Sequence, residues 1–470
     1  MINKICFFLS IVAIFSCNEG TDNLEIEKLE KEILSKVDLP SFPDYEIMLS
    51  PVGNTEDIKP IFDSLINELS KAGGGKLIVN PGVYFFDGPL VLKSNIHLAF
   101  EDSVVVKFSS NPSSYLPLKK VRWEGTDIYN YSPFIYAENE KNIAITGKVT
   151  FDGSANEEMA SWRPKQDKAK GMVRSYGKSG VALSERKFGD SSFLRPSFMQ
   201  FMECEKILIE GITIKNVPFW VIHPTYCKDV TIRNVFINSL YLNNDGIDID
   251  SGEEVLIENC RFICGDDAIA IKSGLNEDGW KVNKPSKNIL IRNCKAIKVL
   301  HGLAFGSDLS GGIENVLIRD VQLDFVKEKA IQFKSNLDRG GNLKEVFISN
   351  VKIDTCEIGL YLTNNYHSYA GGNSPTKFKD IYIEKVTCGF ASGQGIQIEG
   401  LEESKVENIQ LGNIDIEKEN KASSIFNVSS LKMSNVTINQ EKINQEDIII
   451  NSSESKIEEV DYFDEKSTAF

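Results

Sequence analysis

The sequence lacks an excess of positive charge, a long apolar run and a metal-binding pattern of cysteine and histidine. Its 470 residues carry a formal net charge of −15, which disfavours general attraction to nucleic acid or to an anionic membrane. No pair among the nine cysteines has metal-ligand spacing with accompanying histidine. We therefore expect no nucleic-acid partner, no bound metal and no other cofactor.

The main apolar run lies at the N-terminus, where Lys4 precedes residues 5–15. This run is too short to span a bilayer comfortably and is typical of the core of a signal peptide. Cys17 follows almost directly, as the lipidated cysteine does in bacterial lipoproteins, so we expect a signal over residues 1–16 and a lipid anchor on Cys17. The alternative is a plain secretory signal. Both interpretations predict export, and the first predicts an outer-membrane, periplasmic or cell-surface lipoprotein that contacts the membrane only through its anchor.

From about residue 142 onward, the sequence repeats a short apolar unit followed by a turn residue. The units recur at intervals of about 23 to 35 residues. A minimum in the low twenties with variable insertions is typical of a parallel β-helix, in which each repeat forms one coil. We expect an all-β fold, a right-handed parallel β-helix over residues 51–455, with a C-terminal tail over 456–470. The repeats begin at Ile207, Val230, Val255, Ile289, Val316, Val346, Ile381 and Ile409.

A short helical cap is expected before the repeats. Apolar residues recur at helical spacing within residues 56–72, Asn54 or Thr55 can cap the start, and Gly73 ends the pattern. Such a helix would shield the end of the solenoid core from water. Residues 17–50, which are rich in Glu and Lys, are expected to form a tether.

Several cysteines occupy the same position of the repeat, as in Asn259-Cys260 and Asn293-Cys294. Stacked, buried thiols are the favoured interpretation, because free cysteine is among the most buried residue types. A disulfide is the alternative in an exported protein. The cysteines outside the signal and the anchor are Cys204, Cys227, Cys260, Cys264, Cys294, Cys356 and Cys388.

The stretch from residue 243 to residue 274 carries two acidic clusters about one repeat apart. Asp245 belongs to the first cluster, and Asp266 and Asp267 form the second. If each repeat is one coil, the clusters lie on neighbouring strands about 4.7–4.9 Å apart. Crowded carboxylates raise the pKa of at least one member, which supplies the acid and the carboxylate that glycosidic-bond cleavage requires. A polar ladder or a Ca²⁺ site is the alternative.

Four motifs in this order resemble the signature series of family 28 glycoside hydrolases, the polygalacturonase family. They are Asn243-Asn244-Asp245, Gly265-Asp266-Asp267, His301-Gly302 and Lys334. The resemblance runs from about residue 53 to residue 401. Any one motif alone would be a weak signal, but four in order at suitable spacing are a strong one.

The resemblance implies a role for each matching residue. Asp266 would protonate the leaving oxygen, and Asp245 and Asp267 would position and deprotonate the attacking water. His301 would orient or tune the acid. The family inverts the anomeric centre without a covalent intermediate, and we expect the same here.

Two positions depart from the family pattern. Leu300 stands where the third motif usually has glycine, and Gln332 stands where the fourth has arginine. In the family, that arginine and the lysine matching Lys334 pair with a galacturonate carboxylate, and glutamine does not replace a bidentate arginine. Arg339 is a candidate for compensation. Further candidate substrate-binding residues are Asn243, Lys272, Arg195, His223, for which a core role is the alternative, and Tyr366.

The sequence therefore predicts a monomeric glycoside hydrolase that cleaves an α-linked, galacturonate-containing pectic polysaccharide or oligosaccharide. The long insertion over residues 126–192 would favour exo-action if it walls off one end of the site. One rival is a β-helix polysaccharide lyase, which would need a Ca²⁺ cluster and a basic residue as the proton acceptor. Another is a carbohydrate-binding solenoid without catalysis.

Overall fold

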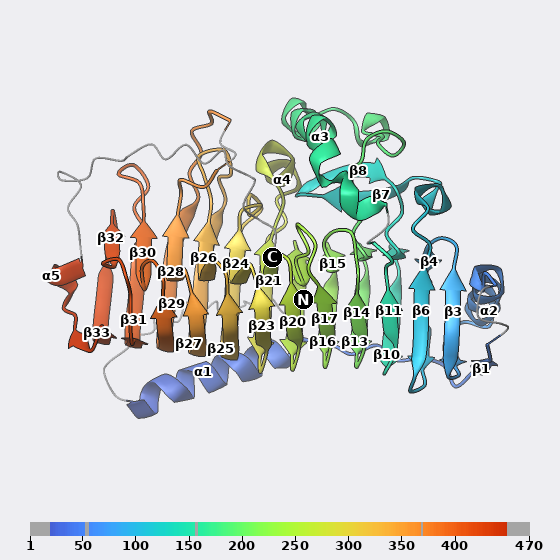
Figure 1. The fold of residues 1–470 in the computed structure, drawn as a ribbon, viewed down its shortest axis with the longest axis horizontal. Helices are drawn as coiled ribbons and strands as arrows, with labels where there is room; N and C mark the ends of the chain where they lie inside the picture. The colour runs from blue at the N-terminus through green and yellow to red at the C-terminus, as the bar shows by residue number, and fades with distance from the viewer. Residues whose placement is uncertain (1–18, 52–55, 156–157, 368–369, 449–470) are drawn as a thin grey trace, which may run out of the picture.

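The computed structural model describes residues 19–51, 56–155, 158–367 and 370–448 (Figure 1). The predicted signal over residues 1–16, the anchor Cys17 and the tail over 456–470 lie outside the described residues. The candidate capping residues Asn54 and Thr55 also lie outside them. These predictions remain expectations.

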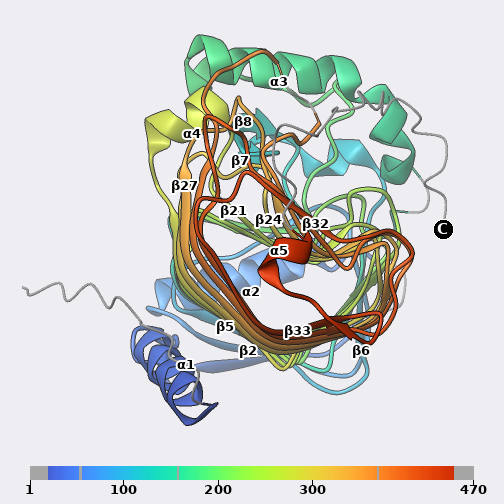
Figure 2. The same ribbon diagram turned by 90° about the vertical axis from the view of Figure 1, so that its left-hand side faces the viewer.

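Two long sheets wind together into a right-handed parallel β-helix, as predicted (Figures 1 and 2). We call the 21-stranded sheet sheet A and the 11-stranded sheet sheet B. Neighbouring strands run parallel, except β33 and β34. Sheet A comprises β1 (Glu46–Leu49), β2 (Gly75–Val79), β3 (Gly82–Phe86), β5 (Ile96–Phe100), β6 (Val104–Phe108), β10 (Lys141–Gly147), β11 (Thr150–Asp152), β13 (Glu205–Glu210), β14 (Thr213–Lys215), β16 (Lys228–Arg233), β17 (Phe236–Ser239), β19 (Glu253–Glu258), β20 (Arg261–Cys264), β22 (Ser286–Arg292), β23 (Lys295–Val299), β25 (Ile313–Val326), β27 (Asn342–Cys356), β29 (Lys377–Ala391), β31 (Glu407–Ile416), β33 (Leu431–Ile438) and β34 (Glu441–Lys442). Sheet B comprises β4 (Leu90–Val91), β9 (Ile135–Glu138), β12 (Met199–Met202), β15 (Ile222–Thr225), β18 (Ile247–Asp250), β21 (Asp267–Lys272), β24 (His301–Gly306), β26 (Lys329–Lys334), β28 (Ile358–Thr363), β30 (Ile396–Glu399) and β32 (Ser424–Phe426).

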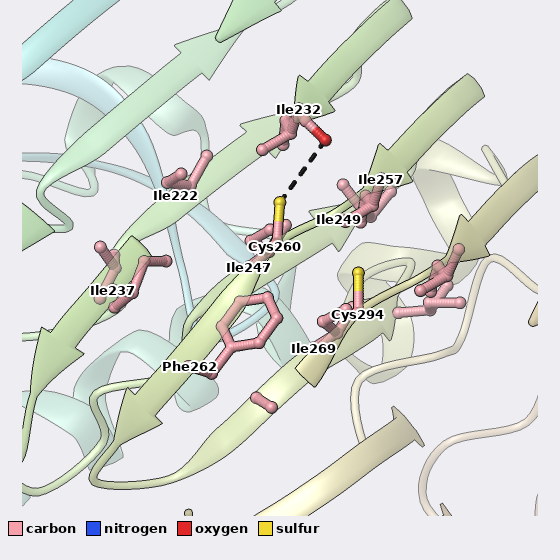
Figure 3. Close-up of a cluster of buried hydrophobic side chains, with 14 of the residues drawn as sticks. Ile222, Ile232, Ile237, Ile247, Ile249, Ile257, Cys260, Phe262, Ile269 and Cys294 are labelled. Carbon is pink, nitrogen blue, oxygen red and sulfur yellow. Dashed lines mark hydrogen bonds between the residues drawn. The ribbon is translucent and has the colours of Figure 1, made fainter. Parts of the chain in front are cut away.

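The predicted repeats are the strands of sheet A, and their apolar residues stack in register. Val230 pairs with Val255, which pairs with Ile289 on the next coil. Ile232 and Ile257 form the next inward row. Side chains from both sheets fill the space between them (Figure 3). Burying one such side chain stabilises the folded state by about 1.5–3 kcal/mol, and every coil of the stack buries equivalent side chains.

The turn residue of each repeat adopts a left-handed backbone conformation, which asparagine and aspartate tolerate better than most residues. This explains the recurring polar residue after each apolar unit. Asparagine side chains on neighbouring coils also bond to each other, as in Asn435 Nδ2 to Asn413 Oδ1 at 2.8 Å. Turn residues with φ between 52° and 56° include Asn234, Asn259, Asn293, Asp320, Asn350 and Asn413.

All seven cysteines outside the predicted signal and anchor are free and buried, which confirms the prediction of stacked thiols. Cys356 and Cys388 lie on neighbouring coils with their sulfur atoms 3.7 Å apart. Cys260 donates to the carbonyl of Ile232 inside the core (Figure 3). The cysteines therefore serve as small core side chains.

The ends of the solenoid are covered by helices. The predicted cap is α2 (Lys59–Lys71), which buries Phe62, Ile66 and Leu69 against the first coil. The short α5 (Gln445–Ile448) lies against β33 at the other end (Figure 1). Within the described ranges, no helix is both long enough and apolar enough to span a membrane.

The predicted tether over residues 17–50 contains regular structure in its described part. Residues 19–34 form helix α1 (Glu19–Leu34), and β1 joins the edge of sheet A. Helix α1 packs on the outer face of sheet A through Ile26 and Ile33, which contact a stripe that includes Leu256 and Leu290 (Figure 2). The outer apolar stripe gives this segment a surface to bind.

Irregular segments gather over sheet B. The antiparallel hairpin of β7 (Lys119–Trp123) and β8 (Thr126–Asn130) lies there with α3 (Asp167–Ser179) and α4 (Asn276–Val282) (Figures 1 and 2). We call these four elements the roof. Gly177 of α3 lies close to Asp278 of α4 and to Thr126, so the roof is a packed unit. The 3-10 helices are η1 (Pro112–Tyr115), η2 (Met159–Lys165) and η3 (Leu183–Glu185).

Candidate active site

The two acidic clusters come together at the start of β18 and β21, beside β24. The backbone amide of Gly246 donates to the carbonyl of Asp267 at 2.9 Å, which sets Asp245 on the strand next to Asp267. On the other side, Asp267 pairs in register with His301. Parallel stacking thus gathers Asp245, Asp266, Asp267 and His301, the four residues predicted to be catalytic.

Asp267 is held as a buried carboxylate. Its Oδ1 accepts hydrogen bonds from His301 Nδ1 and Gln332 Nε2, both at 2.9 Å, and Lys334 Nζ lies 3.0 Å from Oδ2. Burial alone would raise the pKa of Asp267, but the adjacent Lys334 and His301 lower that pKa far below its usual range. Asp267 is therefore ionised near neutral pH.

His301 lies between three carboxyl groups. Its Nδ1 is 2.9 Å from Asp267 and 3.3 Å from Asp266 Oδ1, and its Nε2 is 3.2 Å from Glu328. Burial lowers its pKa, but hydrogen bonds to the three carboxyl groups outweigh burial and raise the pKa to about 10. Ligand atoms of Asp266, Asp267 and His301 lie within 4.8 Å of one another. The protonated form of His301 places a positive charge among these carboxyl groups.

Asp266 is the most accessible carboxyl group of the three. Its side chain is 18% exposed, against 4% for Asp245 and 1% for Asp267. Asn243 Nδ2 lies 3.3 Å from Asp266 Oδ2 and orients it. Asp266 is therefore the group best placed to meet a ligand on sheet B.

Asp248 joins the site although the sequence analysis did not select it. It is fully buried, and Lys272 Nζ lies 3.4 Å from its Oδ1 and 3.5 Å from Asp245 Oδ2. Burial raises the pKa of Asp248 to about 7 despite Lys272. Burial, Asp248 and Asp266 raise the pKa of Asp245 well above its usual range. These two aspartates therefore retain a proton near neutral pH.

Arg195, predicted to bind substrate, is instead fully buried beneath the site. Its guanidinium donates to the carbonyl of Leu242 at 2.7 Å and to Asn243 Oδ1 at 2.7 Å. It thus fixes the turn that carries the first acidic cluster. Burial of this cation was not predictable until the position of Gln166, which accepts from Arg195 Nε at 3.1 Å, was known.

His223 and Arg339 also lie away from any ligand-binding surface. His223 is fully buried, and its Nδ1 lies 3.0 Å from Gln200 Nε2. Burial lowers its pKa, so it is a neutral structural histidine. Arg339 is buried too, and its guanidinium donates to the carbonyl of Ser307 at 3.0 Å and to Asn276 Oδ1 at 2.8 Å. The prediction that these two residues contact substrate does not fit their positions.

Gln332 and Lys334 point to the same carboxylate rather than outward. Both are buried, and both donate to Asp267. Tyr366 is partly exposed, and its ring lies 5.6 Å from Lys334 Nζ. Of this group, Tyr366 is the residue positioned to contact a ligand.

The site offers carboxyl groups in two protonation states and no neutral amine. Asp267 is ionised, whereas Asp245 and Asp248 retain a proton, which suits acid–base catalysis. Burial would lower the pKa of Lys272 and of Lys334, but neighbouring carboxylates raise both above the usual range. Neither lysine is available as the proton acceptor that a lyase requires.

Comparisons with known proteins agree with this geometry. A family model described as glycosyl hydrolases family 28 matches residues 94–437. A solved exopolygalacturonase from Thermotoga maritima is 35% identical, covers 89% of this chain and 97% of its own, and superposes with a TM-score of 0.81. A Vitis vinifera protein described as "Probable polygalacturonase" is 26% identical over 77% of this chain and 72% of its own. An endo-polygalacturonase from Pectobacterium carotovorum is 23% identical over 68% of this chain and 75% of its own.

Proposed function

The chain belongs to family 28 of the glycosyl hydrolases, and we propose that it hydrolyses α-linked galacturonate in pectic polysaccharide or oligosaccharide with inversion of the anomeric centre. The observation that carries this proposal is the grouping of Asp245, Asp266 and Asp267 on neighbouring strands around the protonated His301. That grouping supplies both an acid and a base on the outward face of sheet B.

In the proposed mechanism, Asp266 donates a proton to the glycosidic oxygen as the bond to the anomeric carbon breaks. A water molecule, positioned by Asp245 and Asp267, attacks that carbon from the opposite face, and its proton passes to the ionised Asp267. Asp245 keeps its own proton, because burial, Asp248 and Asp266 raise its pKa well above the usual range. One proton is given and one is taken, and no covalent intermediate forms.

His301 and Lys334 keep Asp267 ionised until the water attacks. Without them, the buried Asp267 would take up a proton and could not assist the water. Asn243 holds Asp266 toward the substrate side. The residues around the carboxyl groups thus fix which one is the acid.

The substrate assignment and the cellular location are further parts of the proposal. The similar Thermotoga maritima structure is described as an exopolygalacturonase, and the roof over one part of sheet B supports exo-action here. The predicted signal over residues 1–16 and the lipid anchor on Cys17 would export the enzyme and attach it to a membrane surface. A monomer is expected.

Asp266→Asn tests the catalytic assignment. We expect turnover of oligogalacturonate to fall by about 10² or more, because general acid catalysis typically contributes about 10²–10⁴, while binding of the substrate changes little. The control is Asp102→Asn, an exposed aspartate paired with Lys148 away from sheet B, which should keep wild-type turnover. Wild-type turnover in Asp266→Asn would remove Asp266 from the mechanism.

A further inference from the structure

Within the described residues, the cations around the catalytic carboxyl groups, on sheet B and in the loop after β26, are occupied by the protein's own groups. Lys272 pairs with Asp245 and Asp248, and Lys334 pairs with Asp267. Arg339 is buried with its donors on backbone and amide oxygens. A substrate carboxylate at the catalytic carboxyl groups therefore needs a cation from another element.

Helix α3 of the roof begins beside the buried residues that support the catalytic acid. Gln166, the residue before its first turn, accepts from Arg195 Nε at 3.1 Å. Arg195 donates to Asn243 Oδ1 at 2.7 Å, and Asn243 contacts Asp266 at 3.3 Å. The start of α3 is thus linked to Asp266 by a continuous chain of side-chain hydrogen bonds.

Two cations project from α3 just beyond this start. Lys170 and Arg174 are four residues apart and share one face of the helix. Both lie at Glu124, in the turn of the β7–β8 hairpin, with Lys170 Nζ at 2.8 Å and Arg174 Nη2 at 3.6 Å from its Oε2. The side chains of Lys170 and Arg174 are 24% and 35% exposed. Two accessible cations therefore share one carboxylate, which leaves an excess positive charge.

The loop after β28 lies near the same positive charge. The His367 ring packs against Tyr366 with ring centroids 4.0 Å apart, and Lys334 Nζ lies 5.6 Å from the Tyr366 ring. Partial desolvation together with Lys334, Lys170 and Arg174 lowers the pKa of His367 to about 4. The α3 cations and Lys334 are therefore all close enough to this loop to act on the charge of His367.

We propose that Lys170 and Arg174 bind the carboxylate of a galacturonate unit next to the cleaved bond and so take the place of the arginine that Gln332 replaces. This inference rests on the proposed function. Arg174 can supply a bidentate fork and Lys170 a point charge. Glu124 holds both cations in place while the site is empty and competes with the substrate carboxylate for them.

The test measures KM and kcat on a galacturonate oligomer and on its methyl ester, which has the same shape without the charge. We expect Arg174→Gln and Lys170→Gln each to raise KM for the acid by about tenfold or more, as loss of a charge-assisted hydrogen bond does, with little change for the ester. Each single variant leaves Glu124 with one cation. Arg174→Lys keeps the positive charge and should recover most of the increase in KM for the acid. The control is Lys178→Gln, an exposed lysine at the end of the same helix.

Glu124→Gln should change KM for the acid in the opposite direction. Removing the competing carboxylate should lower KM for the acid several-fold, whereas a purely structural role of Glu124 predicts weaker binding of both substrates. If the wild type cleaves the oligomer, two results would overturn the inference. One is an unchanged KM for the acid in Arg174→Gln and Lys170→Gln, and the other is an equal change in KM for the acid and the ester. Absence of cleavage by the wild type would overturn the proposed function itself.

Discussion

At the scale of single residues, neighbouring aspartates are held in opposite protonation states. Asp267 has cationic donors on both oxygens, whereas both oxygens of the buried Asp248 lack a hydrogen bond from a donor group. The same side chain is therefore ionised in one place and close to neutral in the other. This contrast leaves Asp267 as the ionised carboxylate of the mechanism we propose.

The raised pKa of Asp248 should appear in the pH dependence of stability. Because its pKa is about 7 in the folded protein and about 3.9 when unfolded, the folded state binds more protons between these values, and stability falls as pH rises from about 4 to about 7. Asparagine is neutral at every pH. We expect the Tm difference between Asp248→Asn and the wild type to shift in favour of the variant by ~2 °C or more from pH 4 to pH 9, as measured by calorimetry. An equal Tm difference at both pH values would contradict a raised pKa of Asp248 in the folded protein.

Glu328 should help to keep His301 protonated. The chain has four histidines, so the His301 imidazole can be followed by NMR titration. We expect Glu328→Gln to lower the pKa of His301 from about 10 by about one unit or more, because a hydrogen-bonded carboxylate is lost. Glu357→Gln, which removes the other carboxylate near Lys329, serves as the control and should leave His301 unchanged. An unchanged pKa in Glu328→Gln would mean that the two aspartates alone hold the proton.

Sequence reasoning placed the catalytic aspartates because stacking in a solenoid depends only on the repeat. It missed Asp248 although that residue lies three positions after Asp245, because alternation in a short strand did not show which carboxyl groups would be buried together. It also offered Arg195, His223 and Arg339 as candidates for substrate binding, with a core role as the alternative for His223. Their burial depends on segments outside the repeat, and no local pattern predicts it.

At the scale of elements, helix α1 packs on an apolar stripe on the outer face of sheet A. Leu256, Leu290 and Leu317 point outward from three neighbouring strands and pair in register. Glu30 of α1 bonds to Arg292 and Arg319 at 2.6 and 2.7 Å beside them. The outward leucine in three successive repeats was the available signal for this docking.

Ile33→Ala tests whether α1 is held mainly by its apolar contacts. Ile33 is fully buried, and such a truncation costs about 2–5 kcal/mol, which exceeds what a short docked helix can lose without opening. We expect faster amide hydrogen exchange over residues 19–34 with unchanged activity, since α1 lies on sheet A, away from the roof (Figure 2). The exposed Glu27→Ala should leave exchange unchanged. Exchange equal to wild type in Ile33→Ala would show that the Glu30 ion pairs hold the helix by themselves.

At the scale of the whole molecule, a strongly acidic protein is proposed to cleave an acidic polymer. The net charge of −15 opposes long-range attraction, so binding must come from cations concentrated beside the site. The solenoid was predictable because its apolar unit recurs at regular intervals in the sequence. The insertion over residues 126–192 was predicted to wall off one end of the site, but the helices of the roof were not predicted, because the insertions have no periodic partner. Lys170 and Arg174 lie on one of these helices.

The most direct measurement is proton NMR of the new anomeric centre during digestion of a galacturonate oligomer by the wild-type protein. The account predicts a saturated galacturonate product that appears first in the β configuration and then equilibrates, because water attacks opposite the leaving group without a covalent intermediate. A product that first appears as the α anomer would contradict the inverting mechanism. An unsaturated product would make the protein a lyase and contradict the roles given to Asp245, Asp266 and Asp267.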